Sequence, residues 1–294
     1  MSTKLQNLLQ FVPKHSPPTE FDISIFKSFI DRSRKLFVLT GAGISTESGI
    51  PDYRSETVGL YARSNHKPVQ YKQFLDSPLV RQRYWARNYV GWERFSNAQP
   101  NVIHHWLKDW EVDHNRISTL VTQNVDNLHR KAGSCNVIEL HGTAYKVVCL
   151  NCSNSYNRHT IQQIMHESNS EMNETTTMIR PDGDVEISED RIAHFKPPMC
   201  NRCGGILKPD IIFFGDNIPR SRVVKVEEAV SESDGILVLG SSLSVYSAYR
   251  IILQAVGLRK EIAIVNIGST RADNCAHIKI SAKCGDILKL ATGS

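Results

Sequence analysis

Short runs of apolar residues recur along the chain and are separated by stretches of helical periodicity. The runs occupy residues 35–40, 117–122, 136–140, 235–239, 261–267 and 277–281, and most are rich in Val and Ile. The clearest helical spacing falls within residues 21–33, where Ile23, Phe26, Phe29 and Ile30 recur on one face. Short strands separated by helices are typical of a parallel sheet that is buried on both faces.

A glycine turn follows the first apolar run. Gly41-Ala42-Gly43 comes directly after residues 35–40 and before a helix start. This order opens dinucleotide-binding units, because glycine lets backbone N–H groups approach a pyrophosphate. Thr46 stands where the third glycine of G-x-G-x-x-G would be, so the turn alone is a weak signal. Together with the strand pattern, it predicts an α/β protein with a doubly wound, Rossmann-like parallel sheet.

Polar clusters follow three of the predicted strands. In a doubly wound sheet, ligands bind beyond the carboxyl ends of the strands, so clusters at this position are expected to line one crevice. Each cluster alone would be a loop, but together they favour a site. They are Gln123-Asn124-Val125-Asp126, Gly240-Ser241-Ser242 and Asn266-Ile267-Gly268.

Two cysteine doublets follow the string Glu139-Leu140-His141-Gly142. They are Cys149-x-x-Cys152 and Cys200-x-x-Cys203. Each C-x-x-C doublet offers two sulfurs to one ion, and four thiolates leave a tetrahedral Zn²⁺ no open position. Unrelated core cysteines or two disulfides are the alternatives, and the repeated spacing and lack of secretory features disfavour them. The doublets therefore predict one structural zinc ion in a sizeable inserted module.

These signals divide the chain into four parts. Residues 1–20 form an N-terminal leader, 21–148 the first part of the Rossmann-like domain, 149–203 the smaller zinc-binding module and 204–294 the second part of the domain. Residues 53–97 are expected to form a helical excursion over the crevice. The leader carries Lys4, Lys14 and His15 and no acid before Glu20, a feature of mitochondrial transit segments.

The interior of the zinc module, residues 167–190, is polar. A solvated loop is the expected structure for the acidic run at its end, although its length would also let it fold over the crevice and regulate access. The acidic residues are Asp182, Asp184, Glu186, Glu189 and Asp190.

Composition excludes several classes of protein. With 294 residues, 40% hydrophobic and 22% charged, the chain can bury a full core, and no apolar stretch approaches the ~20 residues of a membrane span. The net charge of +5 comes from dispersed basic residues, which suits an anionic ligand better than nucleic acid. The remaining cysteines, Cys135, Cys275 and Cys284, are odd in number, as in a reducing compartment. A monomer is expected, because no heptad pattern is evident.

The ordered motifs resemble those of the sirtuins, which are NAD-dependent protein lysine deacylases. The resemblance covers the chain from about Phe11 to Leu290. Asp216 and the run at residues 81–88 are similar to the class II, mitochondrial sirtuin-four type. The motifs are Gly41-Ala42-Gly43-Ile44-Ser45, Gly49-Ile50-Pro51-Asp52-Tyr53-Arg54, Thr122-Gln123-Asn124-Val125-Asp126-Asn127-Leu128-His129 and His141-Gly142, with the two doublets.

The resemblance implies a reaction and a set of site residues. The acyl-lysine oxygen attacks the ribose as nicotinamide leaves, and a base then deprotonates a ribose hydroxyl. His141 would be that base, since imidazole has a suitable pKa, and Asn124 and Asp126 would complete the catalytic set. The resemblance places the NAD co-substrate against Gly41, Ala42, Gly43, Ser45, Asp52, Tyr53, Arg54, Gln123, Asn124, Val125, Asp126, Gly240, Ser241, Ser242, Asn266, Ile267, Gly268 and, through its backbone, Cys284. Asp52 and Arg54 could equally form an ion pair within the loop.

The acyl group would contact Tyr84 and Arg87, which share a helix face at i, i+3. Tyr-x-x-Arg resembles the carboxylate clamp of desuccinylating sirtuins, because guanidinium binds carboxylates in a bidentate way. A structural tyrosine and a surface arginine are the alternative. The peptide would add a strand between Phe214-Gly215 and Leu243-Ser244-Val245, and Ser247 stands where many family members carry proline.

The expected function is removal of longer, branched, dicarboxylic or lipoyl groups from lysine in preference to acetyl, with release of nicotinamide and O-acyl-ADP-ribose. Protein mono-ADP-ribosyl transfer and a weakly catalytic NAD-sensing role are the alternatives. The expected partners are acylated metabolic enzymes of the mitochondrial matrix, with neither nucleic acid nor a membrane as partner.

Overall fold

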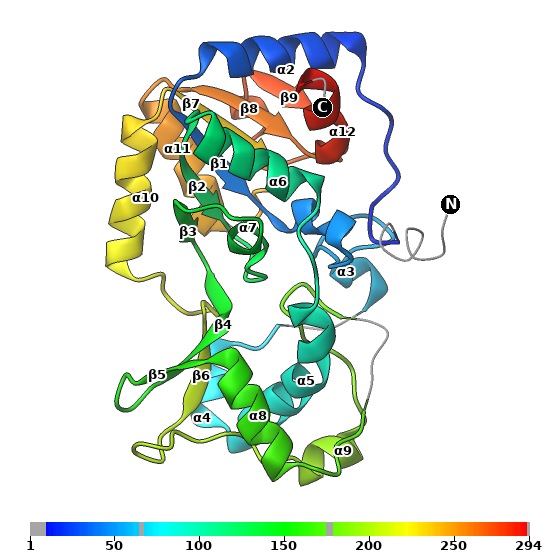
Figure 1. Cartoon of the computed structure of the whole chain (residues 1–294), viewed down its shortest axis with the longest axis vertical. Helices are drawn as coiled ribbons and strands as arrows, with labels where there is room; N and C mark the ends of the chain where they lie inside the picture. The colour runs from blue at the N-terminus through cyan, green and yellow to red at the C-terminus, as the bar shows by residue number, and fades with distance from the viewer. Residues whose placement is uncertain (1–9, 65–67, 175–178, 293–294) are drawn as a thin grey trace.

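A six-stranded sheet in the order β3-β2-β1-β7-β8-β9 is the centre of the larger lobe (Figure 1). All its paired strands are parallel. The computed structural model describes residues 10–64, 68–174 and 179–292, so residues 1–9 of the predicted leader lie outside the described residues. The strands are β1 (Leu36–Thr40), β2 (Ile117–Thr122), β3 (Val137–Glu139), β7 (Gly235–Leu239), β8 (Glu261–Val265) and β9 (Ile278–Ile280).

Both faces of this sheet are covered by helices, as the apolar runs predict. Leu36 and Val38 of β1 point toward α2, α6 and α12, whereas Phe37 and Leu39 point toward α10 and α11; none of the four is exposed. This alternation follows from the two-residue period of a strand. The helices are α2 (Glu20–Arg32), α6 (Val102–Lys108), α10 (Arg220–Glu232), α11 (Tyr246–Gly257) and α12 (Cys284–Thr292).

The smaller lobe has a sheet of its own, which the sequence pattern did not reveal. Its antiparallel strands, in the order β5-β4-β6, are β4 (Gly142–Cys149), β5 (Ser155–Asn157) and β6 (Leu207–Ile211). The sheet begins before the predicted start of the zinc module at residue 149 and continues beyond its predicted end at residue 203. Four helices surround it: α4 (Tyr71–Asp76), α5 (Pro78–Ser96), α8 (Arg158–Ser168) and α9 (Glu189–His194).

The helical excursion belongs to this lobe. Trp85 and Phe95 of α5 share one core cluster with Val147 of β4 and Leu207 of β6. Helix α5 therefore completes the hydrophobic core of the small lobe and also lies beside the crevice.

The observed boundaries lie close to the predicted ones. Helix α2 starts after Thr19, whose hydroxyl accepts from Asp22 N in a capping box. The helix start expected after β1 is a 3₁₀ helix, η1 (Ala42–Ser48). The remaining elements are α3 (Leu60–Arg63), η2 (Asp109–Asp113), α7 (Leu128–Lys131) and η3 (Asp273–Cys275).

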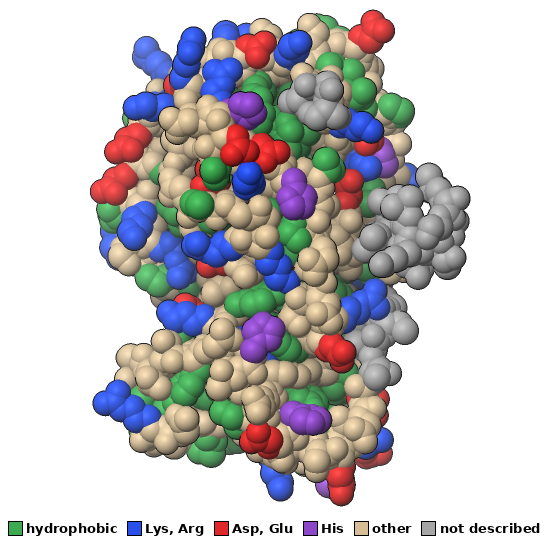
Figure 2. Space-filling model, in the orientation of Figure 1, with side chains coloured by type: hydrophobic (Ala, Val, Ile, Leu, Met, Phe, Trp, Pro, Cys, Tyr) green, Lys and Arg blue, Asp and Glu red, His purple; other side chains and the backbone are tan. Residues whose placement is uncertain are grey.

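Acidic and basic side chains are interspersed on the face shown in Figure 2. Within the described residues, no helix has both the length and the apolar character that a bilayer crossing requires.

Candidate active site

A large cavity lies at the carboxyl ends of β1, β2, β7 and β8 and extends to the small lobe. Its volume is about 1310 Å³, and it is lined by His141, Tyr84 and every residue predicted for the cofactor except Cys284. Pockets for drug-sized ligands span roughly 300–1,000 Å³, so this cavity has room for a dinucleotide together with an acyl-lysine.

The glycine turn after β1 lines the cavity and also contacts the loop after β7. The N–H groups of Gly41 and Gly43 donate to the carbonyls of Leu239 and Gly240 at 3.1 and 2.9 Å, so these two groups are bound within the protein. A Cβ on Gly43 would lie 2.8 Å from the Gly240 carbonyl oxygen. Glycine is required here because the loops after β1 and β7 are in contact, and Gly41, Gly43 and Gly240 at this contact line the cavity.

A buried hydrogen-bond network joins the loops after β1 and β2. The Ser45 hydroxyl donates to Asp126 Oδ2 at 2.6 Å, and the Asn124 amide donates to Ser45 Oγ and the Gly41 carbonyl, each at 3.1 Å. The Gln123 amide reaches Ser241 Oγ at 2.8 Å. These polar groups are therefore held in place before any ligand arrives, which is a form of preorganisation.

Burial shifts the pKa of two central groups toward their neutral forms. It raises the pKa of Asp126, against the lowering effect of hydrogen bonds from Ser45 and Leu128. It lowers the pKa of His141 to about 4, so the imidazole is neutral at physiological pH. Nδ1 of His141 lies 3.1 Å from the Gln123 carbonyl oxygen. A neutral imidazole facing a cavity has the form that a general base needs.

Asp52 and Arg54 line the cavity, and their side chains do not form the ion pair that was the alternative for this loop. Asp52 Oδ1 accepts from the backbone N–H groups of Arg54 and Ser55 at 3.0 and 2.8 Å. The Arg54 guanidinium instead lies over the Tyr61 ring, 5.5 Å from its centroid. Asp52 thus shapes the turn through its side chain, and the Arg54 charge stays beside the cavity.

The acidic run was expected to be a solvated loop, and for its first half this is wrong. Pro181, Asp182 and Asp184 line the cavity, and Asp184 is only 7% exposed. The loop packs backbone to backbone on α5, where a Cβ on Gly91 would lie 2.0 Å from the Gly183 carbonyl oxygen. Spacing and composition could not reveal this close packing.

Tyr84 lines the cavity, but Arg87 does not. The Arg87 Nε donates to Asp184 Oδ1 at 3.0 Å and to the Val185 carbonyl at 2.6 Å. Its Nη2 lies 3.4 Å from the Glu186 carboxylate and has no hydrogen-bond partner among the residues that the structure describes. The expectation that both side chains reach one ligand therefore fails for Arg87 in this conformation, because Asp184 holds its guanidinium.

Cys284 also lies away from the cavity lining. It is 6% exposed, and its thiol donates to the Val265 carbonyl at 3.5 Å. Burial raises the pKa of this thiol to about 12, so it is not a reactive cysteine.

The segments expected to flank a peptide do border the same cavity. Phe214, Gly215, Ser244 and Val245 line it, and Phe214 is 41% exposed. The Phe214 carbonyl accepts from the Tyr71 N–H at 2.8 Å, which anchors this segment to α4. An extended peptide could pair with main-chain groups along this edge.

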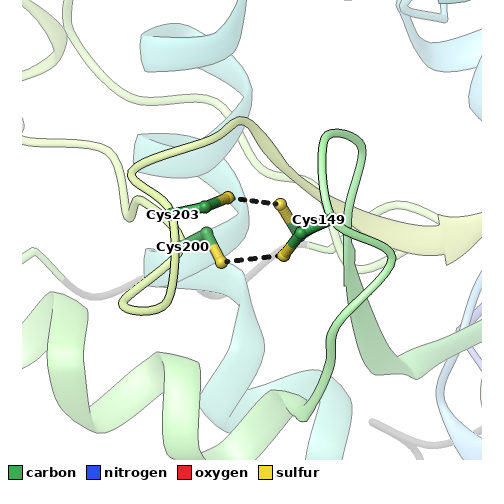
Figure 3. A group of neighbouring side chains, drawn as sticks. Cys149, Cys200 and Cys203 are labelled. Carbon is green, nitrogen blue, oxygen red and sulfur yellow. Dashed lines mark hydrogen bonds between the residues drawn. The ribbon is translucent and has the colours of Figure 1, made fainter.

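The four cysteines of the doublets converge at the end of the small lobe (Figure 3). Their sulfurs lie within 4.8 Å of one another, with Cys149 to Cys203 at 3.6 Å and Cys152 to Cys200 at 3.7 Å. A tetrahedral zinc with Zn–S bonds of about 2.3 Å requires S···S separations of about 3.8 Å. All seven cysteines lie in the described residues and are free thiols, so the thiolates fit one structural Zn²⁺.

The two doublets form matching backbone turns. Ser153 N donates to the Cys149 carbonyl at 3.0 Å, and Gly204 N donates to the Cys200 carbonyl at 2.7 Å. Each turn presents two sulfurs on the same side, as the C-x-x-C spacing predicts. The zinc site lies at the tip of the small sheet and contributes no residue to the cavity.

Comparison with known proteins agrees with this architecture. The Sir2 family model matches residues 41–247. The NAD-dependent protein deacylase Sirt4 of Drosophila melanogaster is 56% identical over 95% of this chain and 89% of its own length. The NAD-dependent protein lipoamidase sirtuin-4, mitochondrial, of Homo sapiens is 48% identical over the same shares. A structure of Sir2Tm bound to a propionylated peptide has a TM-score of 0.71 at 29% identity and covers 92% of this chain and 97% of that chain.

The match begins at the glycine turn after β1, includes both cysteine doublets and ends at Ser247 on the cavity wall. It therefore covers β2, β3 and β7 of the larger sheet, the zinc lobe and most residues that line the crevice. The similarity to the 56% identical relative extends over 95% of the chain, and the resemblance seen in the motifs is confirmed. This chain belongs to the Sir2 family.

Proposed function

We propose that the protein is an NAD-dependent protein lysine deacylase. The observation that carries the proposal is that one cavity joins a neutral His141, the Ser45–Asn124–Asp126 network and an exposed edge suited to a peptide. The name NAD-dependent protein deacylase borne by the 56% identical relative supports it. NAD supplies the ribose that accepts the acyl group, and nicotinamide leaves.

The residues of this chain have separate parts in the reaction. His141 accepts a proton from a hydroxyl placed beside it, because its neutral ring has one unprotonated nitrogen with an available lone pair. The Gln123 carbonyl orients the ring. Gln123, Asn124 and Asp126 offer amide and carboxyl groups to a carboxamide and to ribose hydroxyls, since each buried polar group of a ligand needs a partner. The Phe214 and Val245 segments hold the acylated peptide.

For the acyl group, we propose that longer, branched, dicarboxylic or lipoyl chains are favoured over acetyl. Tyr84 and Phe213 line the cavity, and Tyr84 packs against the rings of Phe74, Trp85 and Phe213, so this part of the cavity wall is aromatic. Arg87 does not line the cavity, and its charge becomes available to an acyl carboxylate only when Asp184 releases it. The lipoamidase name of the human relative supports a long acyl chain.

The substrates we propose are acylated metabolic enzymes of the mitochondrial matrix. The mitochondrial name of the human and bovine relatives supports the organelle, and the basic composition of residues 1–20 is consistent with it.

Nicotinamide release from NAD with a panel of lysine peptides tests the function. The panel carries acetyl, succinyl, glutaryl, methylglutaryl and lipoyl groups, with His141→Tyr as the control. Release that depends on the acyl peptide and is lost in the His141 variant is the expected result. NAD binding without release on any peptide would refute the deacylase assignment and favour a sensing role, and labelling of the protein by ADP-ribose would favour transferase activity.

A further inference from the structure

The nitrogen of His141 that faces the cavity has a neighbour that the motifs did not assign. Ser247 is the second residue of α11, and its Oγ lies 2.8 Å from Nε2 of His141. Both residues line the cavity. The contact joins the loop after β3 to the helix after β7, two segments more than a hundred positions apart in the chain.

The direction of the hydrogen bonds follows from the chemistry of the partners. The Gln123 carbonyl oxygen can only accept, so the neutral ring carries its proton on Nδ1. Nε2 therefore has the lone pair, and the Ser247 hydroxyl must be the donor to it. A ring bonded at both nitrogens is fixed in tautomer and in orientation.

We propose that Ser247 is a positioning residue for the catalytic base, whose hydroxyl holds His141 as the neutral, Nδ1-protonated tautomer with Nε2 facing the cavity. The inference rests on the proposed function, because His141 matters in this way only if it accepts the substrate proton. The hydroxyl keeps Nε2 paired until a ribose hydroxyl takes its place as donor.

The proposal has a definite consequence for the acid–base behaviour of the ring. A serine hydroxyl can also accept, so on protonation of Nε2 the contact reverses into a charge-assisted bond from Nε2–H to Oγ, and Ser247 favours the charged form. The Gln123 carbonyl acts in the same direction, whereas burial and the charge of Arg222 on α10 favour the neutral form. Removing the hydroxyl is therefore expected to lower the pKa of His141.

Nuclear magnetic resonance titration of the imidazoles in the full chain tests this directly. The His141 signal is assigned by its loss in His141→Ala. Ser247→Ala and Ser247→Pro remove the hydroxyl, and proline is compatible with the first turn of a helix. Ser247→Thr retains the hydroxyl, and Ser231→Ala removes one that lies on α10 and bonds to the Glu227 carbonyl and Gln254.

The expected result is a fall of the His141 pKa by about half a unit to one unit in Ser247→Ala and Ser247→Pro, as the difference between a charged and a neutral hydrogen bond implies. The acid limb of the kcat/KM profile should move to lower pH by the same amount. Ser247→Thr should restore both values, and Ser231→Ala should change neither.

An unchanged His141 pKa in both variants that lack the hydroxyl would overturn the proposal. So would a failure of a folded Ser247→Thr variant to restore the value, because another property of serine would then be responsible. Since the titration needs no turnover, its outcome is separate from success or failure of the deacylase assay.

Discussion

Asp184→Asn is the substitution that most directly tests how the acyl pocket gains or loses a positive charge. Asp184 lines the cavity and holds Arg87 at 3.0 Å, and both side chains are 10% exposed. Asparagine keeps the shape of the side chain and removes the charge. Arg87 would then retain the Val185 carbonyl at 2.6 Å and Glu186 at 3.4 Å, a carboxylate that is 71% exposed and therefore screened by water.

The size of the effect follows from this change of partner. A hydrogen bond to a charged group contributes about 1.5–3 kcal/mol, and 1.4 kcal/mol corresponds to tenfold in affinity. We expect kcat/KM for a glutaryl peptide to rise about tenfold relative to acetyl in Asp184→Asn. The free energy of unfolding should fall by about 1–3 kcal/mol, because Arg87 and Arg180 both lose a charged partner.

Nicotinamide release with glutaryl, hexanoyl and acetyl peptides measures the selectivity, and hexanoyl controls for chain length without charge. Arg87→Met alone should reduce glutaryl turnover far more than acetyl turnover. Combined with Asp184→Asn in a double variant, Arg87→Met should abolish the rise in glutaryl selectivity. Glu186→Gln is the matched control and should change the ratio little. An unchanged glutaryl-to-acetyl ratio in a folded Asp184→Asn that still binds NAD would refute the reasoning, as would equal losses on both peptides in Arg87→Met.

Three further predictions follow from the fold and the site. Cys200→Ser, or a chelator that removes zinc, should lower the melting temperature and the zinc content measured by elemental analysis; a chain with no bound zinc in its native state would contradict the site. Gly43→Ala should weaken NAD binding in calorimetric titration by about tenfold or more, since its Cβ meets the Gly240 carbonyl and overpacking costs ~1–3 kcal/mol. Gly257→Ala is the control and should leave NAD binding unchanged, because a Cβ at Gly257 meets open space. Burial lowers the pKa of His129 to about 3, so as the pH falls below about 6.5 the unfolded chain binds a proton at this imidazole before the folded chain does. The free energy of unfolding, measured in urea, should therefore drop by about 1.4 kcal/mol per pH unit from pH 6.5 towards pH 3. A free energy of unfolding that stays level or rises between pH 6.5 and 5 would contradict this prediction.

Much of the larger lobe could be predicted because its signals are local. A buried strand needs a run of apolar residues, and a strand end that faces a ligand needs polar ones, so both leave a pattern within a few positions of the chain. β1 and β7 were therefore located within a residue, and Asn124, Asp126 and His141 were assigned to one crevice that the structure does contain.

The small lobe was less visible in the sequence, because its antiparallel strands have no shared pattern: β5 has three residues and is largely exposed, whereas β6 is almost fully buried. β4 has the burial pattern of a strand with one face toward a core, and its apolar partner is α5, far away along the chain. The cysteine spacing located the zinc ligands without revealing the sheet that carries them. Periodicity alone also could not show that α5 completes this core.

The sequence by itself determined the order of the strands along the chain, the two zinc turns, the family and the main polar groups of the site. Only the tertiary structure decided which of these groups meet. Asp184 holds Arg87, Ser247 faces His141, and Gly43 lies against Gly240. Each of these contacts joins segments distant in the chain, and the energy of such a contact depends on burial and on distances of a few ångströms, which no local pattern of residues encodes.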